Sequence, residues 1–417
     1  MINIIDELKY RGLIKDFSNE EEVRKLLDEP QTIYCGFDPS ASSMHLGNFV
    51  MISMLMRLQR AGHRIIALVG GGTGMIGDPS GKSKERNLLN ADSVGKNTAA
   101  IKEQLERFID LTHPEKGMIV NNYDWLSKLN LLDYLRDYGK YFPINYMLSK
   151  DIVASRLQSG ISYTEFSYTI LQSIDFLHLF LNENCKIQIG GGDQWGNLTS
   201  GLELIRKTQG VDTKAGCFTV PLLLDSQGKK FGKSEGGALY LDPKLVSPYK
   251  LYQFLFNSGD DDAARYLKIF SFKSIEEIES IIKDHYEHLG QRIAQKALAY
   301  EVTSIIHGED KAKEAVNMSS ALFSGDIKSL SKENIIELLG NMEVNVSEGL
   351  LLEDLLIAIK AASSKREARE FIKGNSVSIN GDKVNDLEKH ITKEDALFNE
   401  FVIVKRGKKN YYLVKFN

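Results

Sequence analysis

The stretch Tyr34-Cys35-Gly36-Phe37-Asp38-Pro39-Ser40-Ala41-Ser42-Ser43-Met44-His45-Leu46-Gly47-Asn48 decides the fold of this chain. The residues just before it, Gln31-Thr32-Ile33, are typical of a strand, and residues 49–58 after it carry apolar side chains at helical spacing. The block therefore predicts a strand, a loop and the start of a helix. Ser42 or Ser43 is the expected cap of that helix.

Two residues of this block favour a bound nucleotide. His45 is expected on the first turn of the helix, where unpaired N–H groups and the helix dipole attract an anion. Gly47 lets a flat group lie against the backbone. The block thus predicts a nucleoside triphosphate, with its phosphates at the helix end and its base over the glycine. For His45 taken alone, a capping or solvated residue is the alternative.

Strands and helices alternate around this block. We expect two short amphipathic helices within residues 2–27, and strands at 31–37, 63–70, 118–120 and 186–190. A helix at about 93–111, capped by Asp92 or Ser93, and another after Gly192 separate these strands. The pattern predicts an α/β domain with a doubly wound parallel sheet, which a helical stretch at 131–184 interrupts as an inserted segment.

The remainder of the chain predicts further domains. After a Rossmann-like domain at 1–246, residues 247–322 are all-helical, and residues 323–350 form a linker with a small helix. Residues 351–417 predict a small α+β domain with a basic helix and a hairpin that turns at Asn-Gly-Asp.

Charge is uneven along the chain. Residues 363–417 hold twelve Lys/Arg and eight Asp/Glu, so the net charge of −4 leaves −8 for the rest. A basic tail on an acidic body favours contact with a polyanion, and a merely solvated tail is the alternative.

Composition narrows the class of protein. A chain of 417 residues, 42% hydrophobic and 26% charged, is typical of a globular protein of two or three domains. We expect no targeting peptide within residues 1–12 and no contact with a membrane, since no stretch is long and apolar enough to span one. The cysteines, Cys35, Cys185 and Cys217, are too few and too far apart for a disulfide framework or a zinc ribbon. They favour a reducing, cytoplasmic location, and we expect no metal site of the protein's own.

The stretch Gly70-Gly71-Gly72-Thr73-Gly74-Met75-Ile76-Gly77-Asp78-Pro79-Ser80-Gly81-Lys82-Ser83 imitates two nucleotide motifs and fits neither. Residues 72–77 match G-x-G-x-x-G, but Asp-Pro-Ser-Gly follows where that motif needs a helix, which argues against NAD. A P-loop needs a glycine five positions before Gly81, where Ile76 stands.

The glycines of this stretch instead let the backbone pass close to a ligand. Asp78 can face an ammonium group. Lys82 and Arg86 lie four residues apart, on one side of any helix there, and can reach phosphate. A flexible, solvated loop is the alternative.

A predicted helix at 163–176 carries a polar face. Tyr168, Gln172 and Asp175 fall at i, i+4 and i+7 among apolar neighbours, where buried polar groups are costly unless they find partners. The spacing leaves open whether they line a pocket, join a polar network between helices or face solvent. In a second glycine turn, at 190–197, Asp193 suits a ribose hydroxyl, or caps the helix that follows, or does both.

A lysine loop, Lys229-Lys230-Phe231-Gly232-Lys233-Ser234, lies far from the first block. By itself, such a run is more often a solvated charge cluster. Together with His45-Leu46-Gly47-Asn48, however, it resembles the paired signatures of class I aminoacyl-tRNA synthetases, His-Ile-Gly-His and Lys-Met-Ser-Lys-Ser. Both sequences depart from those patterns, and both variants resemble those of the bacterial tyrosyl-tRNA synthetases, as does nearly the whole chain.

The resemblance implies a reaction and a set of roles. Tyrosine is expected to react with ATP, helped by Mg²⁺, and the tyrosyl group is then transferred to the 3′-terminal ribose of tRNA(Tyr). Phosphate handling is implied for His45, Ser40, Asn48, Lys82, Arg86, Lys230, Lys233 and Ser234. Tyrosine binding is implied for Tyr34 and Asp175 at the phenolic hydroxyl, for Asp78, Tyr168 and Gln172 at the ammonium group, and for Gln188 near the carboxylate. Nucleoside binding is implied for Gly36, Asp38, Gly47, Gly192, Asp193 and Gln194.

The resemblance also implies an S4-like RNA-binding fold at the C-terminus and a homodimer in which each tRNA reaches across both subunits. Three rival functions remain. A tryptophanyl-tRNA synthetase is not expected to place Tyr34 opposite Asp175. An RNA-binding protein on a synthetase scaffold has no need of the lysine loop, and another nucleotidyl transferase has no need of the basic tail.

Overall fold

The structure is a computed structural model, which describes residues 3–81, 89–157, 160–234, 237–407 and 410–416. The chain forms two compact units. The first contains residues 1–247 and 254–302, and the second contains residues 248–253 and 303–417.

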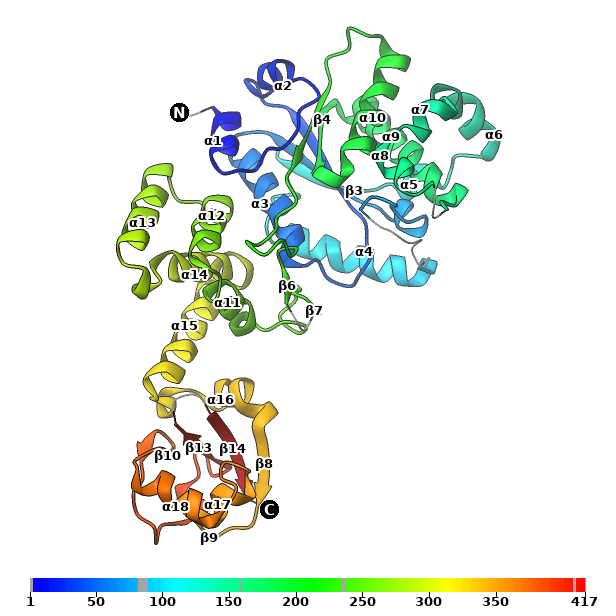
Figure 1. Cartoon of the computed structure of the whole chain (residues 1–417). Coiled ribbons are helices and arrows are strands. Elements are labelled where there is room, and N and C mark those ends of the chain that lie inside the picture. Colours follow the sequence, from blue (N-terminus) through cyan, green and yellow to red (C-terminus); the bar gives the residue numbers. More distant parts are fainter. Residues whose placement is uncertain (1–2, 82–88, 158–159, 235–236, 408–409, 417) are drawn as a thin grey trace. The chain divides into compact units, whose positions relative to one another are not determined.

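A five-stranded parallel sheet forms the centre of the first unit (Figure 1). Its strands run in the order β3-β2-β1-β4-β5, and the chain order reverses between β1 and β4. This confirms the predicted doubly wound sheet. The strands are β1 (Thr32–Phe37), β2 (Arg64–Val69), β3 (Gly117–Asn121), β4 (Cys185–Gly191) and β5 (Gly216–Val220).

Helices cover both faces of this sheet (Figure 1). Helices α3 (Leu46–Arg60) and α4 (Ala91–Glu106) pack near β2, and helices α9 (Tyr163–Glu183) and α10 (Trp195–Gln209) pack near β4. The N-terminal helices α1 (Ile4–Tyr10) and α2 (Glu20–Leu27) match the predicted amphipathic pair, with Asn3 and Asn19 as their caps.

Two predicted helix caps are wrong. Helix α3 is capped by His45, whose Nδ1 accepts a hydrogen bond from the Asn48 N–H at 3.2 Å, and not by Ser42 or Ser43. The Ser43 hydroxyl is instead buried, where it accepts from Gln104 at 2.9 Å. Helix α4 is capped by Asn90, because its side chain reaches the N–H of the third residue on, so this helix begins two residues earlier than predicted.

The predicted helical insertion is mostly a chain of short segments. These are α5 (Tyr123–Leu126), α6 (Leu131–Asp133), a π-helical turn (Tyr134–Tyr138), a 3-10 turn (Gly139–Tyr141), α7 (Ile144–Leu148) and α8 (Asp151–Ala154). The long helix α9, predicted within the same stretch, belongs to the layer that covers β4.

The helical stretch after the sheet is divided between the two units. Helices α12 (Asp260–Phe270) and α13 (Ile275–Glu287) belong to the first unit, and α15 (Glu309–Ser324) belongs to the second. Helices α11 (Pro248–Phe256) and α14 (Ile293–His307) contain residues of both.

The second unit contains a sheet of its own, in the order β11-β10-β13-β14-β8. Its strands are β8 (Glu343–Val346), β10 (Val377–Ile379), β11 (Asp382–Lys383), β13 (Phe401–Arg406) and β14 (Asn410–Phe416), with β9 (Leu350–Leu351) and β12 (His390–Ile391) paired separately. Helices α17 (Leu352–Ala358) and α18 (Lys365–Lys373) pack on its core, and α16 (Lys332–Leu339) precedes β8.

Two predictions for this region can be compared with the structure. Asn380 and Gly381 turn the β10–β11 hairpin with φ values of 49° and 91°, as the Asn-Gly pair predicts. Strand β8 pairs with β14, so part of the predicted linker contributes an edge strand to this sheet.

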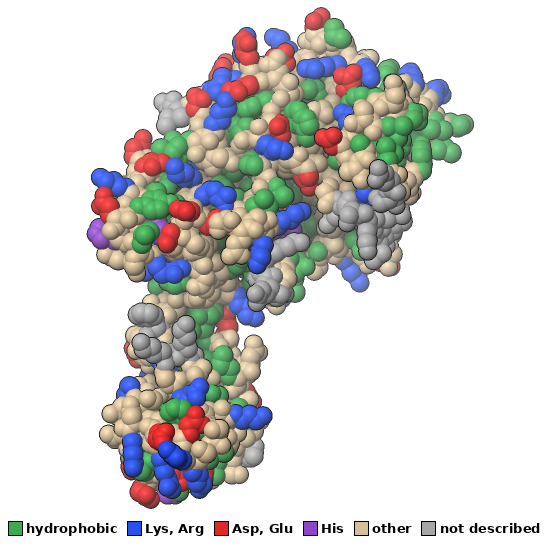
Figure 2. All heavy atoms as spheres, viewed as in Figure 1, with side chains coloured by type: hydrophobic (Ala, Val, Ile, Leu, Met, Phe, Trp, Pro, Cys, Tyr) green, Lys and Arg blue, Asp and Glu red, His purple; other side chains and the backbone are tan. Residues whose placement is uncertain are grey.

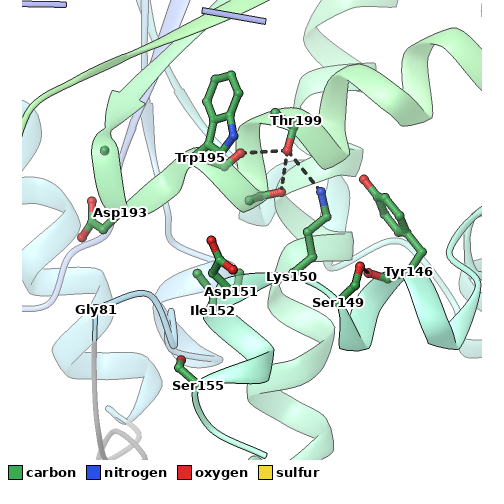
Figure 3. A pocket seen from close by; sticks show the side chains of 12 residues that line it. Gly81, Tyr146, Ser149, Lys150, Asp151, Ile152, Ser155, Asp193, Trp195 and Thr199 are labelled. Carbon is green, nitrogen blue, oxygen red and sulfur yellow. Dashed lines mark hydrogen bonds between the residues drawn. The ribbon is translucent and has the colours of Figure 1, made fainter. Parts of the chain in front are cut away.

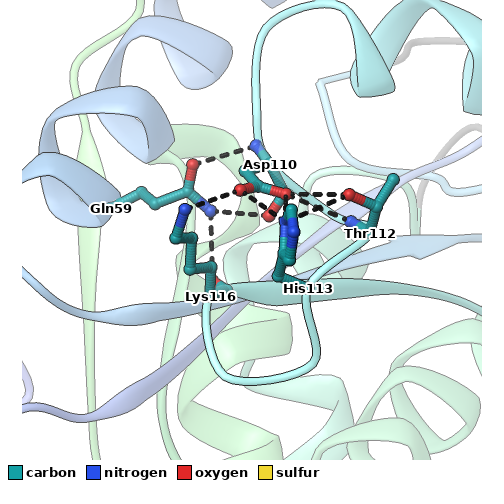
Figure 4. A network of polar contacts seen from close by, with 5 residues as sticks. All are labelled: Gln59, Asp110, Thr112, His113 and Lys116. Carbon is teal, nitrogen blue, oxygen red and sulfur yellow. Dashed lines mark hydrogen bonds and ion pairs between the residues drawn. The ribbon is translucent and has the colours of Figure 1, made fainter.

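A polar network holds the amino-terminal edge of the first sheet (Figure 4). The Asp110 carboxylate contacts His113 at 2.9 Å and Lys116 at 3.0 Å, and these bonds hold its pKa below the usual range. Gln59 accepts from the Asp110 N–H and donates to the carbonyl of Lys116. The loop that enters β3 is therefore fixed from α3, at the opposite edge of the sheet from the carboxyl ends of its strands. Among the helices of the described residues, none has both the length and the apolar character needed to cross a membrane.

Candidate active site

The predicted site residues gather where the strands of the first sheet end. Asp38 follows β1, the turn Gly70–Gly77 follows β2, and Gly192–Gln194 follow β4. In an open α/β sheet, ligands bind outside the carboxyl ends of the strands, at the point where the strand order reverses. That point lies here between β1 and β4.

Asp175 and Tyr34 occupy the buried end of this region. Asp175 is 2% exposed and Tyr34 is 1% exposed, and the Tyr34 ring packs against Phe176 at 5.4 Å. Asp175 accepts hydrogen bonds from Asn122 Nδ2 at 2.9 Å and from Trp125 Nε1 at 2.8 Å. Burial raises the pKa of Asp175 to about 7 in spite of these two donors.

The Tyr34 hydroxyl is a buried polar group with no hydrogen-bond partner among the described residues. Burial, followed by the charge of Asp175, raises the pKa of Tyr34 well above its usual value, so the hydroxyl keeps its proton. A buried hydroxyl without a partner is costly. This end of the region therefore offers an unused hydroxyl and an acidic group to a ligand.

Asp38 connects the strand β1 to the polar face of α9. Its carboxylate accepts from the Tyr168 hydroxyl at 2.7 Å and from Thr73 Oγ1 at 2.8 Å. Asn122 Nδ2 donates to Thr73 Oγ1 at 2.9 Å as well as to Asp175, so one network joins the two carboxylates. Gly70 is required beside it, because a Cβ there would lie 2.1 Å from Asp38 Oδ1.

Asp78 is buried beside the turn that follows β4. Its two oxygens accept from Gln194 Nε2 at 2.6 Å and from the Ser80 N–H at 2.9 Å. Asn197 supports this pair, donating to Gln194 Oε1 at 3.1 Å and to the Ser80 hydroxyl at 3.3 Å. Burial, with the charges of Asp38, Asp78 and Asp175, raises the pKa of Tyr168, so acidic groups surround that hydroxyl.

Two glutamine oxygens remain available in the same region. The side-chain oxygens of Gln172 on α9 and Gln188 on β4 are buried and have no hydrogen-bond partner among the described residues. Gln188 is 1% exposed and lies on the strand beside Tyr34, its register partner. With the Tyr34 hydroxyl, they make three unmet polar atoms in or beside the predicted tyrosine pocket.

The two signature stretches meet at the backbone. A Cβ on Gly232 would lie 2.9 Å from the Gly47 nitrogen, and Gly232 has φ +79°, so only glycine fits there without strain. The Gly232 carbonyl accepts from the Leu239 N–H at 2.9 Å, and the Leu239 carbonyl accepts from Leu46 at 2.7 Å. The lysine loop therefore lies on the first turn of α3, as the paired motifs predict.

The remaining predicted phosphate-handling residues are located to different degrees. Ser40 and Lys230 are exposed, and His45 and Asn48 are half-buried at the start of α3. The backbone of Lys233 and Ser234 forms β6 (Lys233–Ser234), which pairs with β7 (Gly237–Ala238), while their side chains lie outside the description. Lys82 and Arg86 lie outside the described residues.

A cavity of about 560 Å³ opens beside Asp193 (Figure 3). It is bordered by the first turn of α10 and by the segments α7 and α8. Lys150 Nζ donates to Thr199 Oγ1 at 3.2 Å on its wall. Asp193 itself is exposed, and Gln194 rather than Asp193 holds the N-cap position of α10. The cavity is lined by Gly81, Tyr146, Ser149, Lys150, Asp151, Ile152, Ser155, Gly192, Asp193, Trp195, Gly196 and Thr199.

Four residues that hold this site together were not predicted: Thr73, Asn122, Trp125 and Asn197. Asn122 had a usable signal, because it directly follows a parallel strand, where side chains reach the ligand edge. Trp125 and Asn197 had none, since their partners, Asp175 and Ser80, are remote in sequence.

The comparisons with known proteins agree with this geometry. The chain belongs to the tRNA synthetases class I (W and Y), whose family model matches residues 26–324. A second model, the tyrosine–tRNA ligase SYY-like C-terminal domain, matches residues 332–414.

Named relatives point to one amino acid. Tyrosine–tRNA ligase 1 of Bacillus subtilis (strain 168) is 49% identical over 421 residues, and the tyrosine–tRNA ligase of Listeria monocytogenes serotype 4a is 48% identical over 418 residues. In both cases the alignment covers 100% of either chain. A crystal structure of a C-terminally truncated mitochondrial tyrosyl-tRNA synthetase of Aspergillus nidulans is similar at a TM-score of 0.70 and 31% identity, covering 78% of this chain and 95% of that one.

Proposed function

We propose that this chain is a tyrosine–tRNA ligase, which joins tyrosine and ATP to tyrosyl-adenylate and pyrophosphate and then transfers the tyrosyl group to tRNA(Tyr). The observation that carries the amino-acid assignment is the buried pair of Asp175 and the unpartnered Tyr34 hydroxyl. A phenol placed between them accepts from Tyr34 and donates to Asp175. Phenylalanine has no hydroxyl, so within the described part of this buried site Tyr34 stays without a partner and Asp175 keeps only Asn122 and Trp125 as donors, which is costly.

The other end of tyrosine fits the acidic groups around Tyr168. The proposed cradle for the ammonium group consists of Asp78, Tyr168 and Gln172. Hydrogen bonds hold the oxygen atoms of Asp78 and Tyr168 in place, and the buried side-chain oxygen of Gln172 has no partner among the described residues. Gln188 is the proposed neighbour of the carboxylate. An ammonium ion is attracted by the charges of Asp38, Asp78 and Asp175, which already act on Tyr168.

ATP is the substrate of class I synthetases, and the residues at the start of α3 fit its phosphates. His45 Nδ1 accepts the capping hydrogen bond from the Asn48 N–H, which holds the imidazole ring at the start of α3. We assign the phosphates to His45, Ser40, Asn48, Lys82, Arg86, Lys230, Lys233 and Ser234, and the nucleoside to Gly36, Asp38, Gly47, Gly192, Asp193 and Gln194. Mg²⁺ enters with ATP as part of the substrate.

The first step needs no general base, because the tyrosine carboxylate is already a nucleophile. It attacks the α-phosphorus in line, a new C–O–P bond forms, and pyrophosphate leaves with the electron pair of the broken P–O bond. The residues around it contribute position and positive charge. In the second step, a hydroxyl of the terminal ribose of tRNA attacks the tyrosyl carbonyl and AMP leaves.

Two features fit tRNA as the partner. The cavity beside Asp193 adjoins the proposed ribose position and has room for the terminal nucleotide of tRNA. The C-terminal domain carries basic side chains on α18 and matches the SYY-like C-terminal model. We propose that this domain, predicted at residues 351–417 and joined by β8 (Glu343–Val346) in its sheet, binds RNA.

A homodimer fits an exposed apolar surface of the first unit. Leu131, Leu132, Leu135, Ile144 and Tyr163 are 69%, 74%, 47%, 66% and 66% exposed. Figure 2 shows apolar side chains gathered where Figure 1 places α6 and α7. Apolar patches of this kind mark protein interfaces. We propose that a second copy covers this surface and that the protein acts in the cytoplasm.

The deciding experiment is ATP–pyrophosphate exchange with tyrosine, tryptophan and phenylalanine assayed in parallel. Exchange driven by tyrosine alone is the expected result. Exchange driven by tryptophan would replace the proposed substrate, and no exchange with any amino acid would favour an RNA-binding protein on a synthetase scaffold.

A further inference from the structure

The centre of the lysine loop is fixed to a helix that neither signature contains. Phe231 stands between Lys230 and Lys233, yet it is only 6% exposed while Lys230 is exposed. Its ring lies 4.5 Å from that of Tyr266, 5.3 Å from that of Phe270 and 5.8 Å from that of Phe254. Such buried aromatic contacts contribute beyond simple area burial.

One face of α12 contacts the segment from Leu224 to Phe231, which carries Lys230 and is closed by a bridge between Leu224 and Lys230. Asp262, Tyr266 and Phe270 lie four residues apart and so share a face. The Asp262 carboxylate accepts from the Ser226 N–H at 2.9 Å, and the Tyr266 hydroxyl donates to the Leu224 carbonyl at 3.3 Å. Together with the packing of Phe231, these contacts hold both ends of this segment on α12.

The same helix contacts α3, the helix that begins within the other signature. Phe270 stacks on Phe49 of α3 with ring centroids 5.9 Å apart, so its ring lies against both Phe49 and Phe231. The residue after α12 is held as well. The Ser271 carbonyl accepts from Arg11 at 2.7 Å and from Arg57, on α3, at 2.5 Å. Helix α12 is thus anchored to α3 at two places.

We propose that Phe231 is a positioning residue for the transfer of the nucleotide. Its ring, held by Tyr266, Phe270 and Phe254, sets the distance of Lys230 and Lys233 from the start of α3. The two lysines lie one residue before and two residues after this buried ring. This inference rests on the proposed function, because it assigns Phe231 a role in forming the adenylate.

In this proposal Phe231 acts only through the two lysines, so its substitution should affect adenylate formation and not tyrosine binding. Phe231→Leu keeps an apolar side chain but loses the ring contacts, and we expect it to slow adenylate formation by about tenfold. We expect Phe231→Ala to slow it by about hundredfold, because misplacement of charged groups by about 1 Å has effects of that size. The dissociation constant of tyrosine should change by less than about twofold, because Phe231 is not among the groups proposed to bind it.

The experiment compares Phe231→Ala in the wild-type full-length chain and in a Lys230→Ala, Lys233→Ala background, using pyrophosphate exchange and equilibrium tyrosine binding. If Phe231 positions the lysines, the substitution has little further effect once they are gone. An equal loss in both backgrounds, or a matching loss of tyrosine affinity, overturns the proposal. Phe218→Leu, a buried aromatic of β5, is the matched control for lost packing, and a wild-type chain without tyrosine-dependent exchange refutes the proposed function instead.

Discussion

Removal of the Tyr34 hydroxyl should stabilise the protein and weaken its binding of tyrosine. In the Tyr34→Phe variant, a hydroxyl that is 1% exposed and has no partner among the described residues is replaced by hydrogen. An unpaired buried hydroxyl costs about 1–3 kcal/mol, so the free energy of unfolding of the first unit should rise by about 1 kcal/mol or more. For a unit of this size, that corresponds to an increase in Tm of about 2 °C or more.

Tyrosine binding should change in the opposite direction. The variant loses one neutral hydrogen bond to the phenol, with a net value of about 0.5–1.5 kcal/mol, which weakens tyrosine binding by about 2- to 12-fold. Phenylalanine gains, because its ring no longer faces an unpaired hydroxyl. The ratio of tyrosine to phenylalanine affinity should therefore fall by more than tyrosine affinity itself.

Thermal unfolding and equilibrium binding of both amino acids measure these two effects on the same samples. Tyr168→Phe is the contrasting variant, because its hydroxyl donates to Asp38 at 2.7 Å. Its removal takes one hydrogen bond away from the Asp38 carboxylate and should lower stability. If Tyr34→Phe is less stable than the wild type, or if it leaves the tyrosine-to-phenylalanine ratio unchanged, the hydroxyl does not face the phenol.

Further tests of the proposed function concern the lysine loop, Asp175 and the exposed apolar surface. Lys230→Ala and Lys233→Ala should each slow adenylate formation far more than they weaken tyrosine binding, and equal losses in both measurements would argue against phosphate contacts. Burial raises the pKa of Asp175 from 3.8 to about 7. The retained proton contributes stability that is complete below about pH 4 and is lost as the pH rises through about 7. Thermal unfolding of Asp175→Asn should therefore depend less on pH between 5 and 8 than that of the wild type, and parallel curves would show that Asp175 does not titrate there. Leu132→Asp and Ile144→Asp place charges on the exposed apolar surface and should yield monomers in sedimentation, whereas unchanged dimers would move the interface elsewhere.

Local patterns, which depend on nearby residues, predicted four of the five strands of the first sheet and missed β5 (Gly216–Val220). The apolar runs at 63–70 and 186–190 are buried strands, and the Asn-Gly turn adopts the positive φ angles that hairpins need. Helix starts were predicted less well. A serine close to the first turn of α3 looked like a cap, but tertiary contacts draw Ser43 inward to Gln104, and His45 takes its place.

The residues of the site were also predicted best where they lie close together in the sequence. Tyr168, Gln172 and Asp175 share one helix, so their spacing placed them on one face. Whether that face lined a pocket or a network was not decidable from spacing, and the structure contains elements of both: Tyr168 and Asp175 join a hydrogen-bonded network, while the side-chain oxygen of Gln172 has no partner among the described residues. The donors to Asp175 come from 50 or more residues away, and no local pattern signals such a partner.

The contrast between the two ends of the site follows from the roles proposed for them. Recognition of a hydroxyl requires burial, because an unmet hydrogen bond costs little where water can replace the missing partner. Asp175 is therefore buried, even though burial raises its pKa. Charge stabilisation of phosphates requires the reverse, because an exposed ammonium group keeps its charge without a desolvation cost and can move toward its ligand. Lys230 is exposed and meets that condition. Its position in the site then depends on a neighbour that is fixed, and the buried Phe231 next to it is held in place by the fold.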